Sequence, residues 1–281
     1  MRHTTKLRTA HSKALDGAES ASTLEECPAP TIERTRPSDG ACVSVVTLNR
    51  PESRNALSFD LRTLLRQTIN QLDRESDVRA IVLTGADPAF CAGVDLRELD
   101  HPDRTVDLAA PGEPFFVSTT PVIGAINGAA YTGGLELALA CHFRIASERA
   151  LFADTHARMG FAPGRGLTAM LTDAVGSARA RQIVLTGEPI NAGTALAGGL
   201  VNEVVPHEQL LLRACGLAQC MASNDPHAMR RMSETLDSQA AARQSPGWQI
   251  EADAFMGTRP TALPAAPDCA YGSRPNERGH A

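Results

Sequence analysis

The hydrophobic positions of the chain follow two periods, one typical of buried strands and one typical of helices. Residues 41–49 are rich in β-branched side chains, and residues 79–85 and 120–128 form short apolar runs that end at glycine. Continuous runs of this kind are typical of strands buried on both faces of a sheet. Residues 133–147 predict a short helix that leads into another strand. Because strands and helices recur with glycines at the turns, the pattern predicts an α/β core.

The segment between the first two strands predicts an amphipathic helix. Ser58 is a suitable N-cap, and Asp60 lies in the first turn, where a negative charge is favoured. The apolar positions after this cap recur at helical spacing. They are Leu61, Leu64, Leu65, Ile69 and Leu72.

Helical patterns dominate the second half of the chain. Three short segments punctuated by glycine come first, and residues 201–206 predict a last strand. Two longer helical segments follow at 207–223 and 225–240. The second has Asp225 as its cap and Pro226 at the first helical position.

Composition divides the chain into four parts. Residues 1–37 are polar and without periodicity, so we expect a disordered or poorly ordered N-terminal tail. Residues 38–206 form the expected α/β core, and residues 207–257 form a C-terminal helical region. Residues 258–281 are rich in proline and glycine and are expected to be irregular.

Charge and cysteine content narrow the classes of function. The chain has 281 residues and a formal net charge of −5, which argues against a nucleic-acid surface and a polybasic membrane patch. No apolar run approaches the ~20 residues that span a bilayer. The seven cysteines show no metal-ligand spacing and indicate free thiols in a reducing, cytoplasmic compartment. We therefore expect neither a membrane nor a nucleic acid as partner, and no bound metal.

Two short segments match part of a cofactor motif or a metal motif, but their surroundings in the sequence do not fit either motif. Residues 164–169 fit a dinucleotide fingerprint, but they follow Pro163 in mid-chain instead of the first strand of a βαβ unit. His207 and Glu208 open "HEQLL", which lacks the second histidine of a zinc-protease helix. Neither a nucleotide cofactor nor a zinc site is expected.

Two glycine-rich segments, 84–99 and 126–141, form a pair, since each follows a buried strand and precedes a helix. Glycines in such loops let backbone N–H groups approach a ligand. Two such loops side by side could aim two amides at one oxygen, and the helix that begins near Gly133 would add its positive end. Ordinary strand–helix turns would have the same composition, so the residues alone leave both interpretations open.

Four motifs carry a family resemblance: "LNRPESRNALS", "AIVLTGADPAFCAGVDL", "PVIGAINGAAYTGGLELALACHFRIAS" and "FADTHARMGFAPGRG". In this order, between Ala41 and Pro206, they resemble the crotonase, or enoyl-CoA hydratase/isomerase, superfamily. The resemblance implies an α/β fold, a crotonase-like spiral of ββα units with a C-terminal helical oligomerisation region. It also implies a homotrimer or a dimer of trimers. The implied substrate is an acyl-CoA thioester, with coenzyme A as part of the substrate and no separate cofactor.

Members of this superfamily bind the thioester oxygen with two backbone N–H groups, and the motifs carry these donors onto Val94 and Gly133. A thioester carbonyl becomes anionic in the transition state, so fixed dipoles contribute most there. The resemblance places Gly134 and Asp154 among the substrate-binding residues. The segments that contact CoA correspond to Arg54, Asn55, Ala56 and Leu57, and to Ala92, Gly93 and Asp95.

Hydratases of the superfamily hold a water between two glutamates. The first lies three residues after the oxyanion glycine, and Glu136 occupies that place. In the first turn of a helix it would lie near the oxyanion site, and its leucine neighbours leave little polar surface for a solvated glutamate. We therefore expect Glu136 to be the acid/base group.

His156 occupies the position of the second glutamate. If the segment stays extended, Asp154, His156 and Arg158 share one face by strand alternation. His156 could then act as a general base whose tautomer Asp154 fixes. It could equally hydrogen-bond Glu136 and line the pocket, so both roles stay open.

Two further positions depart from the superfamily pattern. His142 stands where relatives often have aspartate, and no basic, aromatic helix that would close over the CoA adenine is recognisable beyond Met256. The resemblance implies an enoyl-CoA hydratase-like lyase that adds water across C2=C3 in fatty-acid or related acyl-CoA metabolism. Two alternatives remain: an enoyl-CoA isomerase, which needs one carboxylate, and a non-catalytic acyl-CoA-binding protein of the same fold.

Overall fold

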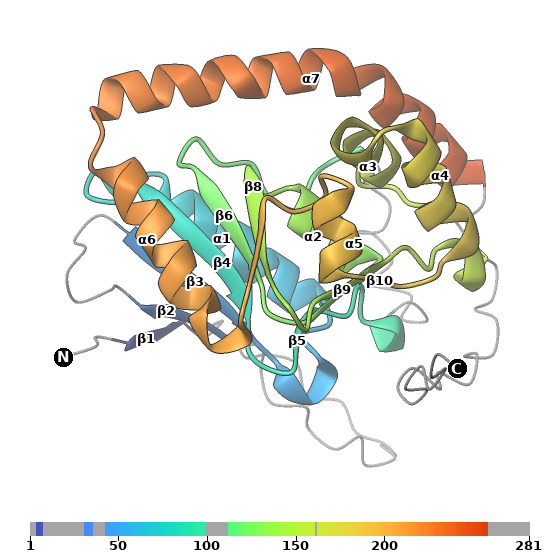
Figure 1. Cartoon of the computed structure of the whole chain (residues 1–281), viewed down its shortest axis with the longest axis horizontal. Helices are drawn as coiled ribbons and strands as arrows, with labels where there is room; N and C mark the ends of the chain where they lie inside the picture. The colour runs from blue at the N-terminus through green and yellow to red at the C-terminus, as the bar shows by residue number, and fades with distance from the viewer. Residues whose placement is uncertain (1–3, 8–30, 36–42, 99–111, 161, 258–281) are drawn as a thin grey trace, which may run out of the picture.

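The computed structural model describes residues 4–7, 31–35, 43–98, 112–160 and 162–257. These residues form two sheets with helices around them (Figure 1). The larger sheet has the strand order β1-β2-β3-β4-β6-β8-β11. Its strands are β1 (Thr4–Leu7), β2 (Thr31–Thr35), β3 (Val43–Asn49), β4 (Ala80–Gly85), β6 (Val122–Ile126), β8 (Phe143–Ser147) and β11 (Glu203–Val205). From β3 to β11 the strands are parallel, whereas β1 and β2 join antiparallel.

The second sheet consists of four short strands in the order β10-β9-β7-β5. They are β5 (Ala89–Cys91), β7 (Ala129–Tyr131), β9 (Leu151–Ala153) and β10 (Ile190–Asn191). The hydrophobic pattern alone predicted loops where β5, β7 and β10 lie, and an extended segment at β9. Strands of two or three residues are too short for a readable alternation of apolar and polar positions.

Successive turns of the chain add one strand to each sheet. β4 is followed by β5, β6 by β7, and β8 by β9, and the three short strands pair in parallel. This repeated arrangement is the spiral that the resemblance implies, so the predicted α/β fold is confirmed, while the oligomerisation role of the C-terminal helices stays a prediction.

Two of the described helices, α1 and α7, begin at the caps that the sequence predicted. The α-helices are α1 (Phe59–Leu72), α2 (Gly133–Leu139), α3 (Leu167–Val175), α4 (Ser177–Thr186), α5 (Ala192–Ala197), α6 (Leu210–Ala222) and α7 (Pro226–Gly257). The 3-10 helices are η1 (Pro51–Ser53), η2 (Leu96–Glu98), η4 (Ala157–Met159) and η5 (His207–Gln209). The Ser58 hydroxyl accepts a hydrogen bond from the Leu61 amide at 3.2 Å, and the Asp225 carboxylate accepts one from the Ala228 amide at 2.8 Å.

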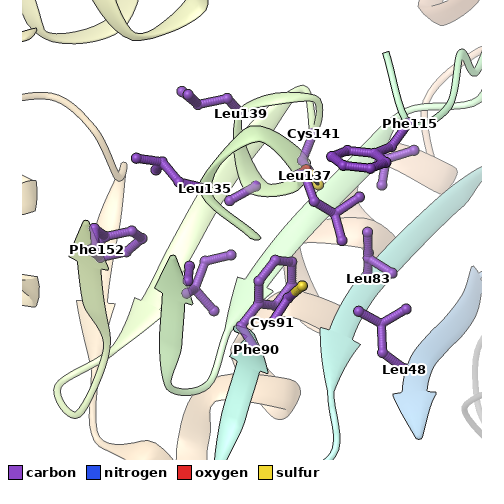
Figure 2. Packing of buried hydrophobic residues seen from close by; sticks show 14 of the residues in the cluster. Leu48, Leu83, Phe90, Cys91, Phe115, Leu135, Leu137, Leu139, Cys141 and Phe152 are labelled. Carbon is purple, nitrogen blue, oxygen red and sulfur yellow. Dashed lines mark hydrogen bonds between the residues drawn. The ribbon is translucent and has the colours of Figure 1, made fainter. Parts of the chain in front are cut away.

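The parallel strands contribute side chains to two apolar cores, one on each face of the larger sheet. Val43 and Val45 pack in a smaller core beneath α6, while Val46 and Leu48 lie in the main core. Figure 2 shows part of the main core, where leucines of α2 pack near Phe90 and Phe152. Full burial of one such side chain stabilises the fold by roughly 1.5–3 kcal/mol. This packing fixes α2, the helix that carries Glu136.

The N-terminal part differs from the sequence-based expectation. The sequence predicts a disordered tail over residues 1–37, but β1 and β2 fall within this range. The prediction is wrong for these two segments, because "TIERT" is rich in β-branched residues and pairs with β3. The other residues of the predicted tail and all of 258–281 lie outside the described residues.

Helix α7 is longer than the helical pattern, which predicts an end near residue 240. It continues through Pro246 to Gly257. A proline in a helix interior removes a hydrogen bond and costs about 3 kcal/mol. The residues after Pro246 pack against α3, and Trp248 contacts the main core. This packing offsets the cost of the proline.

Candidate active site

Two glycine-containing loops meet at the amino end of α2. Gly93, after β5, has a φ of +107°, a region that side chains rarely adopt. A Cβ placed on Gly133 would lie 3.2 Å from the Val94 nitrogen, so the Val94 amide lies against the backbone of Gly133. Neither of these two amides donates a hydrogen bond to another described residue. Both can therefore donate to an oxygen atom of a ligand.

The turn before α2 is tightly constrained. A Cβ on Gly134 would lie 2.0 Å from the Cys91 carbonyl oxygen, so no larger residue fits there without a backbone shift. Thr132 has a φ of +53°, which is unusual for a β-branched residue. Its hydroxyl lies 2.5 Å from the Thr155 hydroxyl. Backbone strain of this kind costs of order 1–3 kcal/mol and persists where neighbouring contacts overdetermine it.

The two predicted CoA-contacting segments lie side by side. The Leu57 amide donates to the Gly93 carbonyl at 2.7 Å, and the Leu57 carbonyl accepts from the Asp95 amide at 3.1 Å. The Ala92 amide donates to the Arg54 carbonyl at 3.0 Å. These bonds attach the first segment, including Ala56, to the loop that carries the Val94 amide.

Two of the predicted contact residues use their side chains inside the protein. The Asn55 amide donates to two backbone carbonyls, both at 2.7 Å, and its oxygen accepts from the Arg50 amide at 2.9 Å. The Asp95 carboxylate pairs with Arg50 at 3.1 Å and with Arg97 at 2.9 Å. Burial would raise the pKa of Asp95, but the hydrogen bonds from Arg97 and Arg50 bring it below its usual value. These side chains stabilise the loops.

Glu136 lies in the first turn of α2, and its exposed fraction is only 3%. Burial raises the pKa of this carboxyl to about 7. The positive charges of His156 and Arg165 act against this rise, while the negative charges of Glu251 and Asp154 add to it. The Arg165 amide donates a hydrogen bond to Glu136 Oε1 at 3.2 Å. Glu136 is therefore a buried acid that can gain and lose a proton near neutral pH.

His156 and Asp154 form a buried pair beside this carboxyl. His156 Nδ1 lies 2.6 Å from Asp154 Oδ1, and the His156 amide donates to the same oxygen at 3.2 Å. Burial would lower the pKa of His156, but the hydrogen bond to Asp154 and the charge of Glu136 raise it above its usual value. The Asp154 carboxylate thus orients the ring so that Nδ1 carries a proton and Nε2 is the remaining ring nitrogen.

Comparison with known proteins places these features in a family. Residues 38–262 match the enoyl-CoA hydratase/isomerase family model. The chain belongs to the enoyl-CoA hydratase/isomerase family. The mitochondrial enoyl-CoA hydratase of Pongo abelii is 35% identical over 220 residues, which cover 77% of this chain and 76% of that protein.

Solved structures of the enoyl-CoA hydratase/isomerase family share this fold. An enoyl-CoA hydratase from Mycobacterium avium is 43% identical, with a TM-score of 0.74 over 81% of this chain and 96% of that one. A monofunctional enoyl CoA isomerase from M. smegmatis is 35% identical, with a TM-score of 0.62 over 76% of this chain and 96% of that one. Proteins similar to this chain therefore include a hydratase and an isomerase.

Arg158 lies apart from the other charged residues of its motif. The extended backbone ends with β9, His156 has helical φ and ψ angles of −53° and −47°, and Arg158 lies in η4. Its side chain is exposed and donates to the Thr186 carbonyl at 3.2 Å. A face shared by Asp154, His156 and Arg158 required an extended segment, and this condition is not met at Arg158, because the chain turns before it.

Two charged residues near Glu136 were missed by the sequence analysis. The Arg165 side chain is buried, donates to the Glu113 carbonyl at 3.1 Å and lies 4.7 Å from the ring centroid of Phe115. Glu251 is a buried glutamate of α7. It lies on the same helical face as Trp248 and Phe255, and a charge among such apolar positions is the signal that could have identified it.

Two histidines lie outside this family site. His142 Nδ1 accepts from the Val122 amide at 3.0 Å, and its Nε2 lies 3.7 Å from Asp237 on α7. His207 lies between the Ser147 hydroxyl at 3.1 Å and a surface aspartate at 3.2 Å, but Ser147 is fully buried and no substrate can reach it. In the described residues, no three His, Cys, Asp or Glu side chains are grouped as metal ligands, and no helix is long and apolar enough to cross a membrane.

Proposed function

We propose that this chain adds water across the C2=C3 bond of an enoyl-CoA thioester. The observation that carries the proposal is the Val94 amide against Gly133, with Glu136 in the same first turn of α2. A thioester oxygen bound by both amides would bring C2 and C3 towards the buried carboxylate. Dipoles that are fixed before the reaction stabilise the enolate that forms when oxygen adds at C3.

Two buried ionisable groups, Glu136 and His156, would each carry out one of the two proton transfers. Glu136, as a carboxylate, removes a proton from water while the water oxygen bonds to C3. The His156 imidazolium then gives a proton to C2 of the enolate, and Asp154 keeps its ring oriented. A pKa of about 7 leaves much of Glu136 ionised at neutral pH, and the raised pKa of His156 favours the protonated ring that this step needs. Return of one proton from Glu136 to His156 restores the starting state.

The CoA portion of the substrate is expected to bind along the two joined loop segments. This expectation is supported by the backbone hydrogen bonds that join Leu57 to Gly93 and Asp95, next to the Val94 amide. Gly134, at the start of α2, is buried and lies against the Cys91 carbonyl, so it would contribute through close backbone approach. The proposed reaction needs no cofactor beyond the coenzyme A of the substrate, because addition of water is redox-neutral.

The test is the loss of absorbance of the conjugated thioester when the full chain is mixed with crotonyl-CoA. We expect the unsubstituted chain to hydrate crotonyl-CoA. The Glu136→Gln variant should be nearly inactive. A natural chain that binds saturated acyl-CoA but hydrates no enoyl-CoA of short, medium, long or aryl type would contradict the proposal and favour a binding protein.

An enoyl-CoA isomerase is the second candidate, and the observation that favours it is His156 at the place of the second glutamate. Moving a double bond from C3 to C2 needs one group that removes and returns a proton, and Glu136 could do this alone. A β,γ-enoyl-CoA substrate distinguishes the two reactions, since isomerisation creates the conjugated absorbance that hydration removes. Isomerisation without hydration would overturn the hydratase assignment.

The described chain also supports a proposal about assembly. Three apolar side chains of α7, Met232, Leu236 and Ile250, are 64%, 65% and 70% exposed. We infer that copies of the chain cover them in a homotrimer or a dimer of trimers, which light scattering on the purified chain would test. We also infer a cytoplasmic location without a membrane or nucleic-acid partner, although the relatives include a hydratase named as mitochondrial.

A further inference from the structure

Four consecutive amides at the start of α3 are divided between two buried carboxylates. The Arg165 amide donates to Glu136 Oε1 at 3.2 Å. The amides of residues 166–168 donate to the two Glu251 oxygens at 2.5, 3.0 and 2.6 Å. The amides at the start of a helix have no partner within the helix, so Glu251 supplies the acceptors that this helix end lacks.

Glu251 reaches this place from the far end of the chain, because α7 lies against α3 (Figure 1). The two elements are in close contact. Gly166 has a φ of +81°, and a Cβ there would lie 2.2 Å from the Trp248 ring; a Cβ on Gly164 would lie 3.0 Å from the Phe255 ring. The two rings thus pack against the backbone that begins α3, on either side of Arg165 in the sequence, and Glu251 itself is only 4% exposed.

We propose that Glu251 is a positioning residue for Glu136. By binding the amides of residues 166–168 it fixes the preceding Arg165 amide, and that amide fixes the Glu136 carboxylate. The inference rests on the proposed acid/base role of Glu136. It makes the last turns of α7 part of the catalytic apparatus through their contact with the start of α3.

The charge of Glu251 acts on the same carboxyl. The charged groups that face Glu136 are His156 and Arg165, which lower its pKa, and Glu251 and Asp154, which raise it. Removal of the charge on Glu251 therefore favours the ionised form of Glu136. In the proposed reaction that form is the base, so the acid limb of the pH–rate profile moves to lower pH.

Two substitutions separate the position of Glu136 from its proton affinity. Glu251→Gln keeps the volume and one oxygen acceptor but removes the charge. We expect kcat to fall by about threefold and the acid limb to move down by about half a pH unit. Glu251→Ala removes every acceptor, and a misplaced catalytic group lowers kcat by about tenfold or more, with KM changed less than about twofold. Hydration of crotonyl-CoA between about pH 5 and 9 gives all three quantities.

The control is Asp253→Asn, which removes a charge two residues further along α7, where the exposed carboxylate accepts from the Gln249 side chain at 2.9 Å. This variant should keep the natural kcat and pH profile. A Glu251→Gln variant with an unmoved acid limb, or a folded Glu251→Ala variant with the natural kcat, would reduce Glu251 to a structural cap. If Glu251→Ala does not fold, the Gln variant alone decides. A natural chain without hydration contradicts the proposed function instead, so the two failures are distinct.

Discussion

The proposed oxyanion side of the site and its proposed acid/base side are built in different ways. The oxyanion side consists of main-chain groups, and each donor lies close in sequence to the strand that positions it: Val94 after β5 and Gly133 after β7. The acid/base side gathers buried side chains from distant elements. Glu136 comes from α2, His156 from the turn after β9, and Glu251 from α7.

This difference determines how each side responds to substitution. Main-chain donors depend on close backbone approach, such as the 2.0 Å between a Cβ on Gly134 and the Cys91 carbonyl. The side-chain groups depend on burial and on one another's charges, which set the pKa of Glu136. Changes on the oxyanion side should therefore act through sterics and weaken binding, while changes on the acid/base side should alter kcat and its pH dependence.

The largest effect is expected from Glu136→Gln. This variant keeps the shape of α2 but removes the group that exchanges protons, so kcat should fall by about 10³-fold. The affinity for a saturated acyl-CoA, measured by calorimetry, should change by less than about threefold because the oxyanion side is intact. A parallel loss of affinity would show that the two sides are not independent.

Gly134→Ala should affect the opposite side. The added Cβ meets the Cys91 carbonyl, so the start of α2 must shift and kcat/KM should fall by about 10²-fold, with weaker binding of saturated acyl-CoA. Gly216→Ala in α6 is the matched control, since its Cβ would meet nothing within 4 Å. It should stabilise the fold by about 0.5–1 kcal/mol in urea unfolding and leave turnover unchanged. Natural turnover in Gly134→Ala would contradict the steric account.

The sequence was informative where structure is local. The leucine spacing after Ser58 predicted α1, and the apolar runs predicted β4 and β6. Gly133 and Glu136 lie within one motif, so their relation could be predicted from a resemblance and one helical turn.

Features that depend on tertiary packing could not be predicted in this way. Strands of two or three residues leave no readable period, which hid the second sheet. Glu251 contacts Gly166 across 85 residues, and no local pattern records that contact. The backbone turn at His156, which separates Arg158 from the site, likewise depends on packing and not on the alternation of side chains.

Asp154→Asn is expected to have the next largest effect on turnover. The carboxylate orients the His156 ring at 2.6 Å and helps to raise its pKa, so its loss should lower kcat by about 10- to 10²-fold. Because His156 must carry a proton in the proposed reaction, a lower pKa moves the alkaline limb of the rate profile to lower pH. Unchanged hydration would assign His156 to the pocket wall.

Glu136 should also cost stability at higher pH. Its pKa in the folded chain, about 7, lies above its ordinary value of 4.5, so its contribution to stability is complete below about pH 4.5 and is lost as pH rises through 7. At about 1.4 kcal/mol for each pH unit between the two pKa values, the lost stability is on the order of 3–4 kcal/mol. In urea unfolding, the free energy of unfolding of Glu136→Gln should therefore rise relative to that of the unsubstituted chain between about pH 5 and pH 8. An equal difference at both pH values would contradict burial of the ionised carboxyl.

Arg158→Ala should have the smallest effect, although Arg158 lies only two residues from His156. Its side chain is exposed and bonds the Thr186 carbonyl, away from Glu136. We expect kcat for crotonyl-CoA within about twofold of the natural value and a stability change within about 0.5 kcal/mol. The contrast with Asp154→Asn tests the backbone turn itself. If the segment were extended during catalysis, both residues would face the substrate, and Arg158→Ala would lower kcat as strongly as Asp154→Asn.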